Sequence, residues 1–135
     1  MLYWDQGKYE QAEPLYQRAI SIREHKLGTE HPDTAKSLNN LANLYIMQGK
    51  YGQAELLNQR ALSIREHKLG TEHPEAAVSL NNLAIIYYRQ GKYSEAELLN
   101  QRALSIREHK LGTEHPHTTE SLDNLAEIYR VQGEI

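Results

Sequence analysis

The feature that most constrains this chain is a block of 42 residues that recurs along it in a single register. The glycine of an expected Gln-Gly-Lys-Tyr turn falls at Gly7, Gly49 and Gly91, and Gly133 follows at the same interval. Residues 17–58 and 59–100 differ at only ten of 42 positions when aligned at this offset. A repeat of this length is typical of solenoids, propellers and arrays, in which each unit buries its apolar face by stacking on its neighbours. Such proteins usually work through an extended surface rather than through a catalytic pocket.

The composition predicts an ordinary folded protein and excludes several classes of function. Hydrophobic residues make up 39% of the chain and charged residues 24%, and the net charge is −3, which disfavours nucleic-acid binding. There is no cysteine, so disulfides and thiolate metal sites are excluded. No apolar run is long enough to span a membrane, and no signal peptide opens the chain. We therefore expect a cytoplasmic protein without a cofactor or metal.

Each repeat is predicted to be a pair of helices joined by a tight turn. Proline suits the first helical turn, so a first helix is expected from Pro32, with an apolar stripe of Leu38, Leu41, Ala42 and Tyr45. A second stripe, at Tyr51, Ala54, Leu57, Ala61 and Ile64, predicts a second helix. Gly49 is expected to end the first helix and Gly70 the second. The fold class is therefore all-α.

The repeat boundaries do not coincide with the ends of the sequence. We expect a partial first repeat over residues 1–31, repeats over 32–73 and 74–115, and the first helix of a further repeat over 116–135. Residues 1–6 are predicted to be the end of a helix, and residues 117–132 a whole one. Incomplete repeats at both ends suggest a natural fragment or an engineered chain, and the sequence leaves both open.

The repeat resembles the tetratricopeptide repeat, in the 42-residue form found in kinesin light chains. The resemblance is carried by Leu38, Leu41, Ala42, Tyr45, Gly49, Tyr51, Ala54 and Ala61. It covers essentially the whole chain. It implies a right-handed superhelical α-solenoid whose first helices line a concave groove that holds peptides or helices of partner proteins. One position departs from the family pattern, because the aromatic Tyr16 is replaced by Asn58 and Asn100 in the next copies, and these amides must find hydrogen-bond partners.

A comparison of the copies with each other gives a candidate binding face. The apolar stripe of the first helix is unchanged between copies, whereas residues on the opposite side of that helix differ. The resemblance places this side in the groove. The predicted partner-binding residues are Trp4, Lys36, Asn39, Asn43, Ile46, Met47, Val78, Asn81, Ile85, Tyr88, Arg89, Glu120, Asp123, Glu127 and Arg130.

The chemistry of this face suggests a ligand with apolar side chains and a basic end. Asn39 and Asn81 form a ladder of amides that can both donate and accept hydrogen bonds to an extended peptide. An apolar strip lies beside them, and Glu120 and Asp123 make one end acidic. The alternative is neutral drift at solvent-exposed positions, which the exposed apolar residues argue against.

The repeated polar residues favour structural roles over catalysis. Six of the seven histidines repeat one pattern at the helix–loop–helix junctions, as in His25 and His31, where capping is expected rather than metal binding. The repeated Ser-Ile-Arg-Glu-His-Lys segment predicts a solvated helix face. No catalytic triad, nucleophile elbow or phosphate-binding loop occurs. An enzyme is therefore not expected.

Two functions remain open at the level of sequence. The first is a non-enzymatic module that binds a protein or peptide in its groove. The second is a self-associating scaffold, in which exposed apolar ends stack on each other or exchange helices to form a homo-oligomer. The ends expected to be exposed carry Leu2 and Tyr3 on one side and Leu125 and Ile128 on the other. The partner and the parent protein cannot be named from the sequence.

Overall fold

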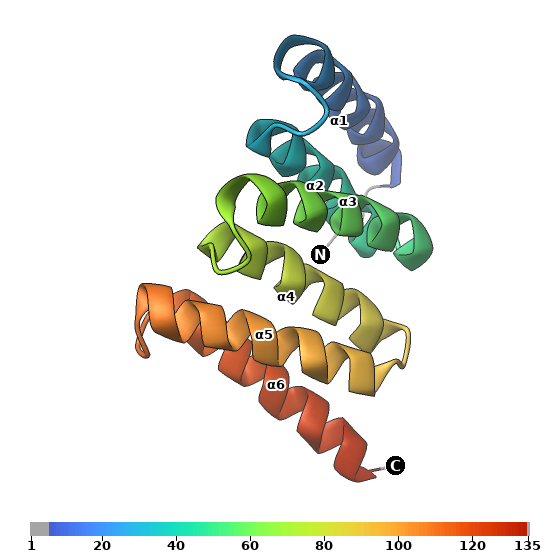
Figure 1. Ribbon diagram of the computed structural model, residues 1–135. Coiled ribbons are helices and arrows are strands. Elements are labelled where there is room, and N and C mark those ends of the chain that lie inside the picture. The colour runs from blue at the N-terminus through green and yellow to red at the C-terminus, as the bar shows by residue number, and fades with distance from the viewer. Residues whose placement is uncertain (1–5, 135) are drawn as a thin grey trace. The chain divides into compact units, whose positions relative to one another are not determined.

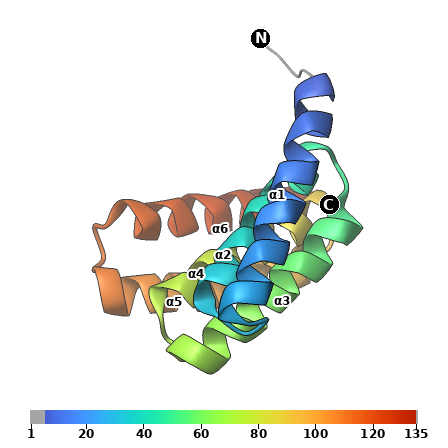
Figure 2. The same cartoon turned by 90° about the horizontal axis from the view of Figure 1, so that it is seen from above.

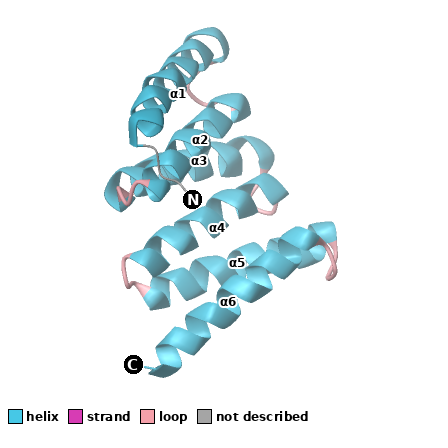
Figure 3. Ribbon diagram, turned by 180° about the vertical axis from the view of Figure 1, so that it is seen from behind, coloured by secondary structure: helices cyan, strands magenta, loops and turns pink. Residues whose placement is uncertain are grey.

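The computed structural model describes residues 6–134, which form six α-helices and no strand (Figures 1 and 3). This confirms the all-α class and the repeated helix–turn–helix. None of these helices is long and apolar enough to cross a membrane. The helices are α1 (Gln6–Leu27), α2 (Pro32–Met47), α3 (Tyr51–Leu69), α4 (Pro74–Arg89), α5 (Tyr93–Leu111) and α6 (Pro116–Glu134).

The helices fall into two compact units, which are described separately. Unit 1 extends to Ile64 and contains α1, α2 and most of α3. Unit 2 begins at Arg65 and contains the end of α3 together with α4, α5 and α6. In unit 1, α1 packs on α2, and in unit 2, α5 packs on both α4 and α6. Figure 2 shows α5 and α6 running in opposite directions on either side of their loop.

Each first helix begins at a proline that follows a capping histidine. His31 Nδ1 accepts a hydrogen bond from the backbone N–H of Asp33 at 3.0 Å. The same bond recurs from Glu75 to His73 and from His117 to His115, again at 3.0 Å. These rings satisfy a backbone N–H that would otherwise lack a partner at a helix start. The capping role predicted for the histidines is confirmed at these three positions.

The tight turns within the hairpins depend on glycine. Gly49 and Gly91 have φ angles of 76° and 79°, a region in which a side chain would be strained. The next residue closes each turn, because the Lys50 N–H donates to the Tyr45 carbonyl at 2.8 Å. Gly7 and Gly133 occupy the same register but lie inside α1 and α6. The prediction of a turn at Gly7 is therefore wrong, because glycine also permits the helical conformation.

The predicted apolar stripe forms the core in α2 and α4 but is uncovered in α6. Leu38 and Leu80 are both buried, whereas the equivalent Leu122 is exposed. The prediction that Ile128 lies at an exposed end is wrong, because this side chain is buried. Ile128 shares its register with the buried Ile86, so it belongs to the packed side of the helix. Leu2 and Tyr3 lie outside the described residues.

An arginine recurs at the same register of α1, α3 and α5, where it is half-buried in α1 and buried in α3 and α5. Arg23 donates to Ser37 Oγ at 2.6 Å, and the bond recurs from Arg65 to Ser79 at 3.0 Å and from Arg107 to Ser121 at 2.9 Å. Arg65 and Arg107 are almost completely buried. The prediction that this segment forms a solvated face is therefore wrong for the arginine. It holds for the next three residues of α5, Glu108, His109 and Lys110, which are exposed.

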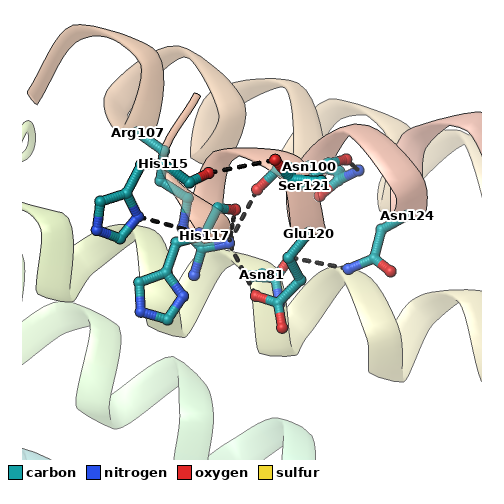
Figure 4. A network of polar contacts seen from close by, with 9 residues as sticks. Asn81, Asn100, Arg107, His115, His117, Glu120, Ser121 and Asn124 are labelled. Carbon is teal, nitrogen blue, oxygen red and sulfur yellow. Dashed lines mark hydrogen bonds and ion pairs between the residues drawn. The ribbon is translucent and has the colours of Figure 1, made fainter. Parts of the chain in front are cut away.

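The asparagines that replace Tyr16 are also buried. Asn58 and Asn100 have no exposed surface. The Asn100 side chain donates to the Ser121 carbonyl at 2.9 Å, so one of its polar groups is satisfied by the neighbouring helix α6 (Figure 4). The requirement for hydrogen-bond partners is thus met only for one half of the Asn100 amide. Asn100 Oδ1 and both polar atoms of the Asn58 amide are buried without a hydrogen-bond partner among the described residues.

Candidate functional site

A pocket of about 200 Å³ lies in unit 2 where α4 and α6 meet. Its apolar lining comes from Ala84, Ile85 and Ile128, and two of these, Ala84 and Ile128, are buried. Polar side chains complete the lining from both helices. The full set of lining residues is Ala84, Ile85, Tyr88 and Arg89 of α4 with Asn124, Glu127 and Ile128 of α6. We call this site the α4–α6 pocket.

Four residues predicted for partner binding come together in this pocket. Ile85, Tyr88 and Arg89 follow each other along one side of α4, and Glu127 faces them from α6. The α4–α6 pocket therefore combines an apolar floor with a tyrosine, an arginine and a carboxylate. Such a combination of apolar lining and a few polar groups is typical of sites that hold a side chain or small ligand.

Glu127 is the centre of a polar cluster at this pocket. The Tyr88 hydroxyl donates to Glu127 Oε2 at 2.9 Å across the two helices. Arg130 donates to both carboxylate oxygens, at 3.0 and 2.6 Å, and also to Glu134 at 2.7 Å. The hydrogen bonds from Arg130 and then from Tyr88 lower the pKa of Glu127 from 4.5 to about 2. The carboxylate is therefore ionised at any physiological pH.

The pKa values of its partners shift in the opposite direction. The hydrogen bond to Glu127 raises the pKa of Tyr88, because removing the tyrosine proton would place a second negative charge beside the carboxylate. The same carboxylate raises the pKa of Arg130. Both groups thus remain hydrogen-bond donors to Glu127 throughout the neutral range. Because they are held in place, the rim of the α4–α6 pocket has a fixed charge pattern.

Removing the tyrosine hydroxyl tests this cluster. In a Tyr88→Phe variant we expect the pKa of Glu127 to rise above about 2 while staying below 4.5, because Arg130 still pairs with it. A lowered native pKa contributes stability above pH 4.5 that is lost as the pH falls through about 2, so the variant should lose this contribution at a higher pH. Carboxyl-carbon NMR titration measures the shift.

Tyr93→Phe is the matched control for that titration. The Tyr93 ring contacts the edge of Tyr88, with ring centroids 5.5 Å apart, and no hydrogen bond from its hydroxyl to Glu127 is present. We expect its removal to leave the pKa of Glu127 unchanged. Equal titration curves for the wild type and Tyr88→Phe would contradict the assignment of the tyrosine as a partner.

Both asparagines of the predicted ladder are buried. Asn81 is only 4% exposed, and its Oδ1 accepts a hydrogen bond from Asn124 of α6 at 3.1 Å (Figure 4). Asn39 of α2 is also buried, at 7% exposure. Asn81 thus links α4 to α6 beneath the surface. A ligand would therefore meet the amide N–H groups of Asn81 rather than its carbonyl oxygen.

The other predicted residues lie outside the α4–α6 pocket. Lys36, Asn43 and Met47 are exposed on α2, and Ile46 is half-buried there. In unit 2, Val78 is half-buried, and Asp123, Glu120 and Arg130 are exposed on or beside the pocket's helices. Glu120 already accepts a hydrogen bond from Arg107 at 3.1 Å. Trp4 lies outside the described residues.

Asn124, Ala84 and Ile128 line the pocket but were not predicted as site residues. The predicted residues are those that vary between copies, whereas Asn124 is the same residue as Asn40 and Asn82. Ala84 was assigned to the constant core stripe for the same reason. The spacing along the helix could have identified Asn124. It lies three residues before Glu127 and four before Ile128, so the three side chains share one helix face. A pocket floor is usually built from such constant packing residues.

No group of three or more histidine, aspartate and glutamate residues between positions 6 and 134 is arranged to hold a metal ion. The His115 and His117 rings stack with centroids 5.2 Å apart, and His115 serves as a helix cap. The titratable cluster around Glu127 is held in ion pairs rather than poised for proton transfer.

Comparisons with known proteins agree with the resemblance noted in the sequence. A family model described as tetratricopeptide repeat matches residues 1–67, and a second with the same description matches residues 76–117. A comparison with curated protein sequences finds no match. The structure is similar to the crystal structure of BtubC (BKLC) from P. vanneervenii, with a TM-score of 0.85 and 27% identity, over 94% of this chain and 51% of that one.

Two further crystal structures are similar to this chain. Both contain nearly identical TPR-like repeats assigned to a kinesin light chain of Podosopora anserina, with 29% identity and TM-scores of 0.76 and 0.74. Each comparison covers 96% of this chain and 61% of the other. The chain therefore spans between 51% and 61% of the length of these solved chains.

Proposed function

Because the chain belongs to the tetratricopeptide repeat family, with repeats of the kinesin-light-chain-like type, we propose that it binds a segment of a partner protein on the side of its first helices. Tetratricopeptide repeats generally mediate protein–protein interactions. In unit 2 the proposed site is the α4–α6 pocket. The proposed role is non-enzymatic, and the partner is a peptide or a helix of another protein.

The observation that carries this proposal is the pocket itself. It lies between two first helices, it is lined by apolar atoms at its base, and the residues that vary between copies surround it. A volume of about 200 Å³ accommodates one large apolar side chain. Burying a side chain the size of leucine contributes about 1.5–3 kcal/mol. That corresponds to an affinity gain of roughly tenfold to a hundredfold.

The polar rim of the pocket suggests how a ligand would be oriented. Arg130 pairs with the charge of Glu127, and Tyr88 donates a hydrogen bond to it, so this carboxylate is an acceptor held in one orientation. Arg89 and Asn124 supply donors on the two sides of the same pocket. A peptide with an apolar anchor residue, flanked by backbone groups that pair with these side chains, fits this arrangement. Because the helices hold the site rigid, only the ligand must be ordered on binding.

Replacing Ile85 by glutamate tests the site with little risk to the fold. Position 85 has the same register as Asn43 and Glu127, so polar side chains already occur there in this protein. A charge placed in the pocket should weaken binding of an apolar anchor by at least about tenfold. The probe is a peptide selected from a displayed random library on the wild type and then measured by titration calorimetry.

Leu98→Glu is the matched control. Leu98 is an exposed leucine on α5 and does not line the α4–α6 pocket. We expect this variant to bind the selected peptide as the wild type does, with circular dichroism confirming that both variants fold. Undiminished binding by Ile85→Glu would place the peptide elsewhere and contradict the proposal. A double Asn39→Ala and Asn81→Ala variant is less informative, because Asn81 also links α4 to α6.

A further inference from the structure

The first helices α2, α4 and α6 each begin with a hydrogen bond that only a neutral imidazole can make. His31, His73 and His115 accept it through Nδ1 from the backbone N–H two residues later, each time at 3.0 Å. A ring nitrogen accepts a hydrogen bond only when it carries no hydrogen, so the single hydrogen of each ring is on Nε2. A second proton would go to Nδ1 and remove the acceptor.

Protonation of such a cap weakens the start of the helix for two reasons. The N–H groups of the first turn have no acceptor within the helix, so the capped N–H loses its partner. The protonated ring also places a positive charge at the end of the helix where the backbone dipole is already positive. Histidine is the side chain that ordinarily changes its charge between pH 8 and 5. Mild acid therefore acts on these caps, whereas an aspartate cap would keep its acceptor.

The three helix starts differ in the residue whose N–H is capped. This residue is Asp33 in α2 and Glu75 in α4, but it is His117 in α6. A carboxylate in the first turn offsets both the positive helix end and the charge of a protonated cap. Helix α6 has no acidic residue in its first turn. Its start therefore lacks the negative charge that accompanies the cap in the other two helices.

At the start of α6 the two imidazoles lie against each other. The rings of His115 and His117 stack with their centroids 5.2 Å apart and their planes 28° apart (Figure 4). His115 is half-buried and His117 is exposed. Protonation of both rings places two positive charges side by side, and like charges at this distance repel. Loss of the cap and this repulsion act in the same direction.

The charged groups packed around this pair do not compensate for it. Arg107 Nη1 of α5 donates to the His117 carbonyl at 3.1 Å, which adds a cation beside the pair. The nearby carboxylate of Glu120 accepts from the same nitrogen at 3.1 Å, so it is already paired. In the loop and at the end of α5, Glu114 and Lys110 are exposed and opposite in sign. The surroundings therefore add no net negative charge.

We propose that the histidine caps make the first helices sensitive to acid, and that α6 opens at its start before α2 and α4 as the pH falls below neutral. This conformational device follows from the caps themselves and does not depend on ligand binding. It acts on the helix that forms one wall of the α4–α6 pocket.

The repeat supplies equivalent reporters of opening in the three helices. The backbone N–H groups of Ala35, Ala77 and Thr119 donate to the carbonyls of the three capping histidines, at 3.1, 3.3 and 3.0 Å. Amide hydrogen exchange of the full 135-residue chain, measured by NMR, reports the opening of each bond. Each rate is divided by the rate of an unstructured peptide at the same pH, which removes the intrinsic effect of pH on exchange. Between pH 7.5 and 5.5 we expect the protection of Thr119 to fall by at least about fivefold, and that of Ala35 and Ala77 to fall less.

Two variants separate the cap from the ring pair. His115→Asp replaces the cap by one that still accepts at pH 5.5, so the protection of Thr119 should become independent of pH in this range. His117→Glu restores the acidic residue found at Glu75, so α6 should respond to acid as α4 does. His109→Gln is the matched control, because His109 is an exposed histidine on α5 that caps no helix start. We expect it to respond as the wild type does.

Three results would overturn the proposal. The first is a protection of Thr119 that is the same at pH 7.5 and 5.5 in the wild type. The second is an equal loss at Ala35, Ala77 and Thr119, which would mean that His117 does not distinguish α6. The third is a full acid response in His115→Asp, which would place the titrating group elsewhere. Circular dichroism at pH 7.5 checks that the variants fold, and the wild-type comparison of the three helices needs no variant.

Discussion

Replacing Leu80 by alanine is expected to lower the free energy of unfolding by about 3 kcal/mol. Leu80 has no exposed surface in α4, so its removal loses the transfer free energy of three carbon atoms and leaves a cavity in a packed region. Urea denaturation followed by circular dichroism measures the change.

Leu122→Ala is the control that the repeat provides. Leu122 is the same residue in the same register of the next first helix, but it is 44% exposed. Its loss should cost less than about 1 kcal/mol, because little apolar contact is removed. Equal losses at both positions would mean that Leu122 is covered in solution, contrary to its exposure in the structure.

The helices could be predicted from the sequence because proline and glycine mark their limits. The first helix was expected from Pro32 to Gly49, and α2 runs from Pro32 to Met47. The second was expected from Tyr51 to Gly70, and α3 runs from Tyr51 to Leu69. Both signals have a local physical cause, the fixed φ of proline and the positive φ of glycine. Helix limits with such a local cause can be predicted from a short stretch of sequence.

The buried arginines could not be predicted, because their cause is not local. In a Ser-Ile-Arg-Glu-His-Lys segment, alternating charges usually indicate a solvent-exposed face. Arg107 is buried only because α6 presents Ser121 and the carbonyl of His117 to it. Both partners lie on the next helix, beyond the loop. A repeated arginine paired at a constant distance of 14 residues with a repeated serine was the signal available in the sequence.

The candidate site was partly predictable, and the missing part again depends on packing. Variation between copies identified Ile85, Tyr88 and Glu127, which the structure brings to one pocket. Variation cannot identify Asn124, because the residue is constant, nor can it show that Asn81 is buried against it. Constant residues form the pocket floor and the link between helices, and variable residues form the rim. Residues that would select a ligand and residues that pack the fold therefore lie on the same two helices, and only the structure shows which residues do which.

Replacing Arg107 by alanine is expected to lower the free energy of unfolding by about 3 kcal/mol. Its guanidinium Nη1 donates to the His117 carbonyl at 3.1 Å, to Ser121 Oγ at 2.9 Å and to Glu120 Oε1 at 3.1 Å (Figure 4). Burial lowers the pKa of Arg107, and Glu120 opposes part of that shift, so the charge is held in place by its partners. Truncation leaves the buried Ser121 hydroxyl without this donor and opens a cavity between α5 and α6.

Arg102→Ala separates this buried role from that of an ordinary surface arginine on the same helix. Arg102 is about half exposed and pairs with Glu66 at 2.9 Å, so its loss should cost less than about 1 kcal/mol. Arg107→Met should fall between the two, because methionine restores packing but not the hydrogen bonds. If Arg107→Ala were no more destabilising than Arg102→Ala, the repeated arginine would be a tolerated feature of the interface. A large and specific loss would instead make the arginine–serine contact a main link between successive helix pairs.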